Sequence, residues 1–207
     1  MTRYWPCHII STRGATLAPP PEPWPFSAPS RVCGVNGQRT GAPPTFSQPP
    51  GAWGCWRSHL RLWEDMLNLN VPGIVVLEED VLYRGWHGIL DFLAAIPADW
   101  DMVYLGGQHL SPPVTAGLPP GVVRGTNINR THAYIVRNNL RTQAAYWRLC
   151  DMSAAPGCRQ HIDYVLGSLH AAGLLTAYAP ARWFCGQAAG NGRSSTTGAP
   201  VAERWWD

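Results

Sequence analysis

The segment that most constrains the fold is an apolar run, Ile74-Val75-Val76-Leu77, that stops abruptly at three acidic residues, Glu78-Glu79-Asp80. Continuous apolar and β-branched residues are typical of a central strand covered on both faces, whereas a half-exposed strand alternates apolar and polar residues. The pattern therefore predicts an interior strand with a cluster of carboxylates at its carboxyl end.

Amphipathic helices are predicted on either side of this strand. The preceding helix should begin near Gly54 and end near 68–70, with an apolar face at Trp56, Leu60, Trp63 and Leu67. The following helix carries Ile89, Phe92, Leu93 and Ile96 on one face and ends at Pro97. Further strands are predicted at 7–10, 31–35, 101–105, 132–136 and 174–178, and further helices at 139–150 and from about 163. This alternation indicates an α/β fold with a mostly parallel central sheet flanked by helices.

The length of 207 residues, of which 45% are hydrophobic, predicts a single domain over 1–207. Two segments differ from the rest in composition. The region 16–53 is rich in proline, and we expect it to be a loop without helices. The tail 184–207 is rich in glycine, serine and threonine from Gly186 onward, which makes it a candidate closing loop.

The charge composition excludes several chemistries. Every positive side chain is an arginine, so a P-loop lysine, a kinase-type strand lysine and a pyridoxal phosphate Schiff base are all excluded. Five arginines between 124 and 148 suit phosphate or form a solvated face, and the net charge of +3 permits an anionic partner without requiring one. With no secretory signal and no membrane-length apolar stretch in the sequence, we expect a cytoplasmic protein; the sequence specifies no oligomeric state.

Six scattered cysteines are expected to be reduced thiols. Cys55 and His59 lie at helical i, i+4 spacing, and Cys150, Cys158 and His161 form a second set of conceivable zinc ligands. Neither set has the tight paired spacing of a zinc module, so the sequence favours the thiol interpretation.

The acidic triplet carries the chemistry. Like charges this close repel, and a hard divalent cation such as Mn²⁺ or Mg²⁺ resolves the conflict, because oxygen ligands suit these ions. On a strand, residues i and i+2 point the same way, so Glu78 and Asp80 are expected to share a face and Glu79 to point away from it. The alternative interpretation is a solvated acidic turn.

The sequence also resembles glycosyltransferase family 25, the lipooligosaccharide and procollagen galactosyltransferase group. The resemblance rests on an ordered series of segments: Gly54 to Leu60, Trp63, Val75 to Val81, Trp100 to Gly107, Thr131 to Val136, His161 to Asp163, Gln187, and Ser194-Ser195. It implies a GT-A (Rossmann-like) fold, a divalent metal and a nucleotide-sugar donor, UDP-glucose or UDP-galactose. Glu-Glu-Asp stands here in place of the usual Glu-Asp-Asp of the family.

The resemblance also implies residue roles. Asp80 is the expected principal metal ligand and Glu78 a second ligand, direct or through water. Asp163 is the candidate base of an inverting transfer, with a helix N-cap as its alternative, and Glu79 is kept as a further catalytic candidate. The remaining candidates, all for binding the donor, are Ser58, His59, Gln187, Arg193 and Ser194. The alternatives are a structural histidine for His59 and a surface arginine for Arg193.

The acceptor stays open between a lipooligosaccharide glycan and a hydroxymethylated base in viral DNA. Two rival functions come from other classes. A glycoside hydrolase would use two carboxylates, but these normally flank the bond from separate positions rather than adjoin one another. A non-catalytic, tryptophan-rich module that binds sugar or nucleic acid would need no metal cluster.

Overall fold

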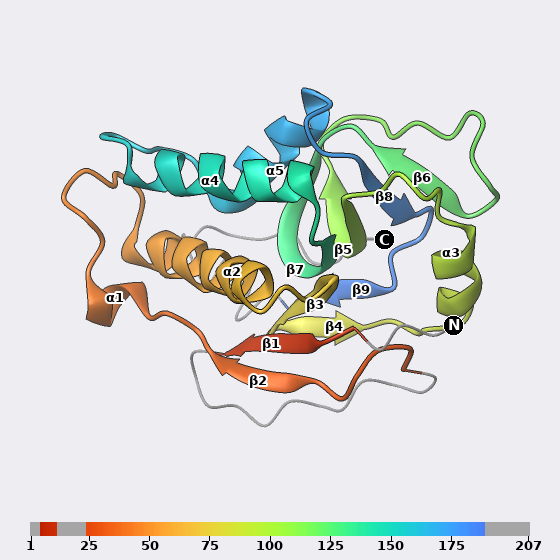
Figure 1. The fold of residues 1–207 in the computed structure, drawn as a ribbon, viewed down its shortest axis with the longest axis horizontal. Helices are drawn as coiled ribbons and strands as arrows, with labels where there is room; N and C mark the ends of the chain where they lie inside the picture. The colour runs from red at the N-terminus through yellow and green to blue at the C-terminus, as the bar shows by residue number, and fades with distance from the viewer. Residues whose placement is uncertain (1–4, 12–23, 189–207) are drawn as a thin grey trace.

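The computed structural model describes residues 5–11 and 24–188, and shows helices packed around a large twisted sheet (Figure 1). In chain order the elements are β1 (Cys7–Ser11), β2 (Ser30–Cys33), α1 (Gly37–Thr40), α2 (Pro50–Asn68), β3 (Gly73–Glu78), β4 (Val81–Tyr83), α3 (Ile89–Ala95), β5 (Met102–His109), β6 (Val122–Gly125), β7 (Ile128–Arg137), α4 (Leu140–Ala154), α5 (Ile162–Ala171), β8 (Ala177–Pro180) and β9 (Cys185–Gln187). Within the described ranges, no helix combines the length and the apolar character that a membrane crossing requires.

The main sheet has seven strands in the order β2-β1-β3-β7-β5-β8-β6. Strands β2, β1, β3, β5 and β8 run in one direction, whereas β7 and β6 run against them. The predicted α/β class with a mostly parallel sheet is confirmed. Strand β3 lies between β1 and β7 and is buried along its apolar run, as the sequence indicates.

The two faces of the sheet hold separate apolar cores. Ile74 and Val76 of β3 face the core that α2, α4 and α5 cover, while Val75 and Leu77 face the core that includes residues of α3. Figure 1 shows α2, α4 and α5 on one side of the sheet and α3 on the other. Because side chains alternate along a strand, Glu78 emerges on the α2 side.

Helix α2 begins earlier than its apolar periodicity predicts. It starts at Pro50 rather than near Gly54, and the fixed backbone angle of a proline suits the first turn of a helix. The four-residue helix α1 lies in the proline-rich region, where we expected no helix, so that expectation is wrong. A Cβ atom at Gly37 would overlap the carbonyl of Pro50, and one at Gly54 would overlap that of Val35. Glycine at both positions therefore lets α1 pack directly on α2.

The segment after β8 is not a loop at its start. Residues Cys185–Gln187 form β9, which pairs antiparallel with β4 in a small second sheet. Val81 is the register partner of Gln187, so β9 runs beside the residues that follow the acidic triplet. The closing-loop expectation is therefore wrong for these three residues, and the rest of it, from residue 189, lies outside the described residues. The prediction of one domain over 1–207 stays a prediction.

Candidate functional site

The acidic triplet lies at the carboxyl end of β3 and is half-buried. Glu78 is the last residue of the strand, and Glu79 and Asp80 form the turn into β4. The three side chains make hydrogen bonds to different parts of the fold. Glu78 contacts α2 and β7, Glu79 contacts β1, and Asp80 contacts β9. Strand alternation ends at Glu78, so the expected sharing of a face by Glu78 and Asp80 does not apply beyond it.

Glu78 is held as a carboxylate. Its Oε1 lies 3.1 Å from Nε2 of His59 and accepts a hydrogen bond from the Thr131 hydroxyl at 2.8 Å. Burial pushes the pKa of Glu78 up, but the hydrogen bond and charge of His59, with the Thr131 bond, outweigh it, so the net pKa is lowered. This acid therefore keeps its negative charge at neutral pH.

His59 belongs to a buried chain of hydrogen bonds behind Glu78. Its Nδ1 lies 3.0 Å from the Tyr134 hydroxyl, which also accepts a hydrogen bond from Nε1 of Trp63 at 3.0 Å. A carboxylate only accepts, so Nε2 of His59 carries the proton toward Glu78, and in neutral His59 the Nδ1 accepts from Tyr134. The family resemblance placed His59 on the donor side; in the structure it is a buried support for Glu78.

Among the described residues, Gln187 is the one side chain that donates a hydrogen bond to the Asp80 carboxylate. Its Oδ2 accepts from the Gln187 amide at 3.1 Å, and its backbone carbonyl accepts from the Ala188 amide at 2.7 Å. Its Oδ1 is buried and has no hydrogen-bond partner among the described residues. Burial, followed by the charge of Glu78, raises the pKa of Asp80 to about 7. A buried, unsatisfied oxygen beside a second carboxylate is what a bound cation would relieve.

Glu79 is tied to the neighbouring parallel strand. Its Oε2 accepts from the Ser11 hydroxyl at 2.7 Å, and Ser11 Oγ in turn accepts from Arg31 at 2.8 Å. Its negative charge adds to the rise in the pKa of Asp80. Glu79 therefore lies near the site while its own side chain is bound to the end of β1.

Asp163 lies in the first turn of α5, where a negative charge favours the helix. The N-cap residue is His161, so the alternative that Asp163 is the N-cap is wrong. Its Oδ1 accepts from the Tyr164 amide at 2.9 Å and its Oδ2 from the Arg130 amide at 3.3 Å. Burial raises the pKa of Asp163, against the charge of His161 and these hydrogen bonds.

Asp163 and Glu78 bind neighbouring residues of β7, because Asp163 accepts from the Arg130 amide and Glu78 accepts from the Thr131 hydroxyl. The charges of Glu78, Asp163 and Asp80 all contribute to the raised pKa of Cys55, after burial. The four side chains come from α2, the end of β3 with its following turn, and α5. The structure thus brings together the metal-ligand candidates and the base candidate that the sequence placed far apart.

Some of the remaining predicted site residues lie at the acidic triplet and others do not. Gln187 lies at the site, on Asp80. Ser58 is buried and accepts from the Val35 amide at 2.8 Å, so its hydroxyl anchors the loop before α1. Arg193 and Ser194 lie outside the described residues. The sequence did not predict a role for Tyr134, because its position in the buried, mostly apolar part of β7 is typical of a core residue.

Comparisons with known proteins converge on one family. The model of "Glycosyltransferase family 25 (LPS biosynthesis protein)" matches residues 50–103, which include α2, β3 and the acidic triplet. The human "Inactive glycosyltransferase 25 family member 3" is 33% identical over 95 residues, which cover 42% of this chain and 16% of that protein. "Procollagen galactosyltransferase 1-B" of Xenopus laevis is 26% identical over 118 residues, covering 55% of this chain and 17% of that protein.

These findings confirm the relationship to glycosyltransferase family 25. A third relative, the "Glycosyltransferase 25 family member" of Anopheles gambiae, is 35% identical over 65 residues, 29% of this chain and 11% of that protein. The chain spans less than a fifth of the length of the curated relatives it matches. The similarity is therefore to one segment of these proteins.

Proposed function

We propose that this chain is a glycosyltransferase that transfers a hexose from a UDP-sugar to an acceptor hydroxyl, with inversion. One observation carries the proposal. Inside the matched family segment, Asp80 holds a buried oxygen without a hydrogen-bond partner among the described residues, next to the ionised Glu78. Such a carboxylate pair is suited to a divalent cation and, through it, to a diphosphate.

The residues present fit a hard cation, Mn²⁺ or Mg²⁺. Asp80 would hold it through Oδ1, and Glu78 would contribute through its second oxygen, directly or through water, because Oε1 is occupied by His59 and Thr131. When bound, such an ion withdraws negative charge from a departing diphosphate. His59 and Thr131 keep Glu78 ionised and oriented for that task.

Asp163 supports the proposal as the candidate base. Two backbone amides orient its carboxylate, and burial raises its pKa, which makes it a stronger base. A base in an inverting transfer takes the proton of the attacking hydroxyl. Glu79 is the second carboxylate candidate, although its hydrogen bond to Ser11 holds it at the end of β1.

The printed names of the relatives support particular substrates. A procollagen galactosyltransferase among them favours UDP-galactose ahead of UDP-glucose as donor. The family description, an LPS biosynthesis protein, favours a lipooligosaccharide-type glycan ahead of a hydroxymethylated DNA base as acceptor. Other relatives are named inactive, so a non-catalytic sugar- or nucleic-acid-binding module is the competing outcome.

The test is release of UDP by the purified chain in the presence of Mn²⁺. A panel of nucleotide sugars is supplied with a lipooligosaccharide acceptor or with hydroxymethylcytosine DNA. We expect acceptor-dependent UDP release that a chelator abolishes. Binding of UDP-sugar without any release would instead favour the non-catalytic module, and release of free sugar from a glycan alone would favour a hydrolase.

A further inference from the structure

Three metal-binding side chains converge beside the proposed cation site. Cys55 and His59 are one helical turn apart on α2, and Glu78 is the last residue of β3. A sulfur, a ring nitrogen and a carboxylate oxygen from these residues all lie within 4.8 Å of one another. The i, i+4 spacing puts the thiol and the imidazole on one face of the helix, directed at the end of the strand.

Each of these three metal-binding side chains makes a hydrogen bond to a neighbouring side chain. The Tyr134 hydroxyl contacts Nδ1 of His59, which leaves Nε2 as the nitrogen on the Glu78 side. Thr131 contacts Oε1 of Glu78 and also hydrogen-bonds the thiol of Cys55. In protein metal sites, such outer contacts fix the tautomer and the orientation of the ligands.

The local charge favours a cation. Burial and the charges of Glu78, Asp163 and Asp80 raise the pKa of the Cys55 thiol well above its ordinary range. The Cys55 thiol therefore lies in surroundings rich in negative charge. A divalent cation would reverse this balance and stabilise the thiolate.

We propose that Cys55, His59 and Glu78 form a second metal site that binds a soft divalent cation, Zn²⁺ or Cd²⁺. A sulfur, a nitrogen and an oxygen ligand match the preference of these ions, whereas an oxygen-only set around Asp80 suits Mn²⁺ or Mg²⁺. On binding, the sulfur–proton bond is replaced by a sulfur–metal bond and the proton goes to solvent. His59 binds through Nε2, and its proton moves to Nδ1, facing the Tyr134 oxygen.

The shared Glu78 links the two sites. Its Oε1 belongs to the thiol-containing site and its second oxygen remains for the hard cation. The inference goes beyond the proposed function, because soft-metal binding needs neither a sugar donor nor an acceptor. Three protein ligands leave a fourth coordination position open to water or to a further ligand.

The experiment is a Cd²⁺ titration of the full chain, first freed of metal with a chelator. Thiolate-to-cadmium charge transfer gives an ultraviolet band, and native mass spectrometry gives the number of ions bound. We expect one Cd²⁺ per chain with the band in the wild type and in Cys33→Ser, which removes an exposed thiol on β2. Cys55→Ser should lose the band, with far-ultraviolet circular dichroism confirming that it is folded.

A second variant separates a metal site from a plain hydrogen-bond network. Tyr134→Phe removes the contact to Nδ1 of His59 but no ligand atom, so Cd²⁺ affinity should fall roughly 10-fold or more while the band remains. The site is overturned if the wild type shows no band, or if the band persists unchanged in Cys55→Ser. Asp80→Asn should retain Cd²⁺ binding, so loss of sugar transfer and loss of soft-metal binding remain distinguishable.

Discussion

Acidic side chains lie at both ends of the parallel strands, and the two ends differ in how fully their carboxylate oxygens are hydrogen-bonded. Asp101 immediately precedes β5, at the end of the sheet opposite to the acidic triplet, and only 1% of its surface is exposed. Both of its carboxylate oxygens are paired. Asp80, at the other end, has one oxygen on Gln187 and one without a partner among the described residues.

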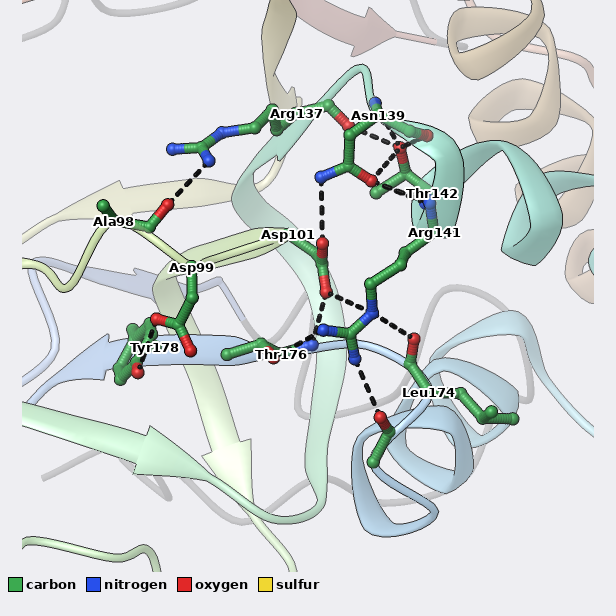
Figure 2. A network of polar contacts seen from close by, with 11 residues as sticks. Ala98, Asp99, Asp101, Arg137, Asn139, Arg141, Thr142, Leu174, Thr176 and Tyr178 are labelled. Carbon is green, nitrogen blue, oxygen red and sulfur yellow. Dashed lines mark hydrogen bonds and ion pairs between the residues drawn. The ribbon is translucent and has the colours of Figure 1, made fainter.

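Figure 2 shows how completely the end around Asp101 is paired. Its Oδ1 accepts from the Asn139 amide at 2.9 Å; its Oδ2 accepts from the Thr176 backbone amide at 2.7 Å and lies 3.3 Å from Nε of Arg141. Asn139 also caps α4 by accepting from the amides of Arg141 and Thr142. This network joins the start of β5, the start of α4 and the approach to β8.

The two ends of the sheet therefore differ in how their buried carboxylates affect stability. A buried carboxylate that is fully paired stabilises the fold, because each lone pair that lost water gained a donor. A buried carboxylate that is half-paired lowers stability unless something else supplies the missing contact. The end with Asp101 joins three elements of the fold, and the end with Asp80 is where we propose that a cation binds.

The largest predicted effect is on transfer. Asp80→Asn removes the charge that would hold the cation, and we expect the rate of UDP-sugar transfer to fall by roughly 1,000-fold, equivalent to about 4 kcal/mol. The control is Asp91→Asn, which neutralises an exposed acid on α3 and should leave transfer unchanged. Full activity of Asp80→Asn would remove the metal assignment.

The opposite end should respond in stability instead. Asp101→Ala leaves the Thr176 amide and the Asn139 side chain without their acceptor, and we expect the free energy of unfolding to drop by about 2–4 kcal/mol. Urea denaturation measures it. Transfer per folded molecule should be unaffected; an equal loss of activity would mean that the two ends are not independent.

The sequence predicted the buried strand β3 and the long helix α2 better than it predicted the short strands. The apolar run before Glu78 and the helical periodicity after Gly54 encode burial directly, so β3 and α2 were found, together with the acids at the carboxyl end of β3. The short strands β4, β6 and β9 were missed, because pairing between residues distant in sequence, rather than local pattern, makes them strands.

The same limit applies to the site. Asp80 and Glu78 follow from their place after a buried strand, whereas the chain from Trp63 through Tyr134 to His59 joins α2 to β7 and exists only once both are packed. Asp163 was identified by resemblance, and only the fold shows that it and Glu78 bind the adjacent residues Arg130 and Thr131.

A smaller loss of stability and activity is expected when the hydrogen bonds of Tyr134 are removed. Tyr134→Phe leaves Nε1 of Trp63 and Nδ1 of His59 without their shared partner, so the free energy of unfolding should fall by about 1–3 kcal/mol. Transfer should fall by roughly 10-fold, because His59 no longer holds Glu78 as firmly. Unfolding curves and the ratio kcat/KM measure the two effects. An unchanged kcat/KM would confine the network to a structural role.

The stability of the metal-free chain should also depend on pH. The pKa of Asp80 in the folded chain, about 7, lies above its ordinary value of 3.8, so the folded state holds this proton more tightly than the unfolded state does. The resulting stability is complete below about pH 4 and is lost as pH rises to about 7. Asp80→Asn should flatten this decline in a metal-free denaturation series. An identical decline in the variant would mean that other titratable side chains cause the loss of stability.

The most direct test of a cation held at Asp80 is the binding of UDP with and without Mn²⁺. Titration calorimetry measures it on the wild type and on Asp80→Asn. We expect the wild type to bind UDP with Mn²⁺ and to lose that binding when the ion is chelated, while Asp80→Asn binds in neither condition. Equal binding of UDP by both proteins, with or without Mn²⁺, would contradict a cation held at Asp80.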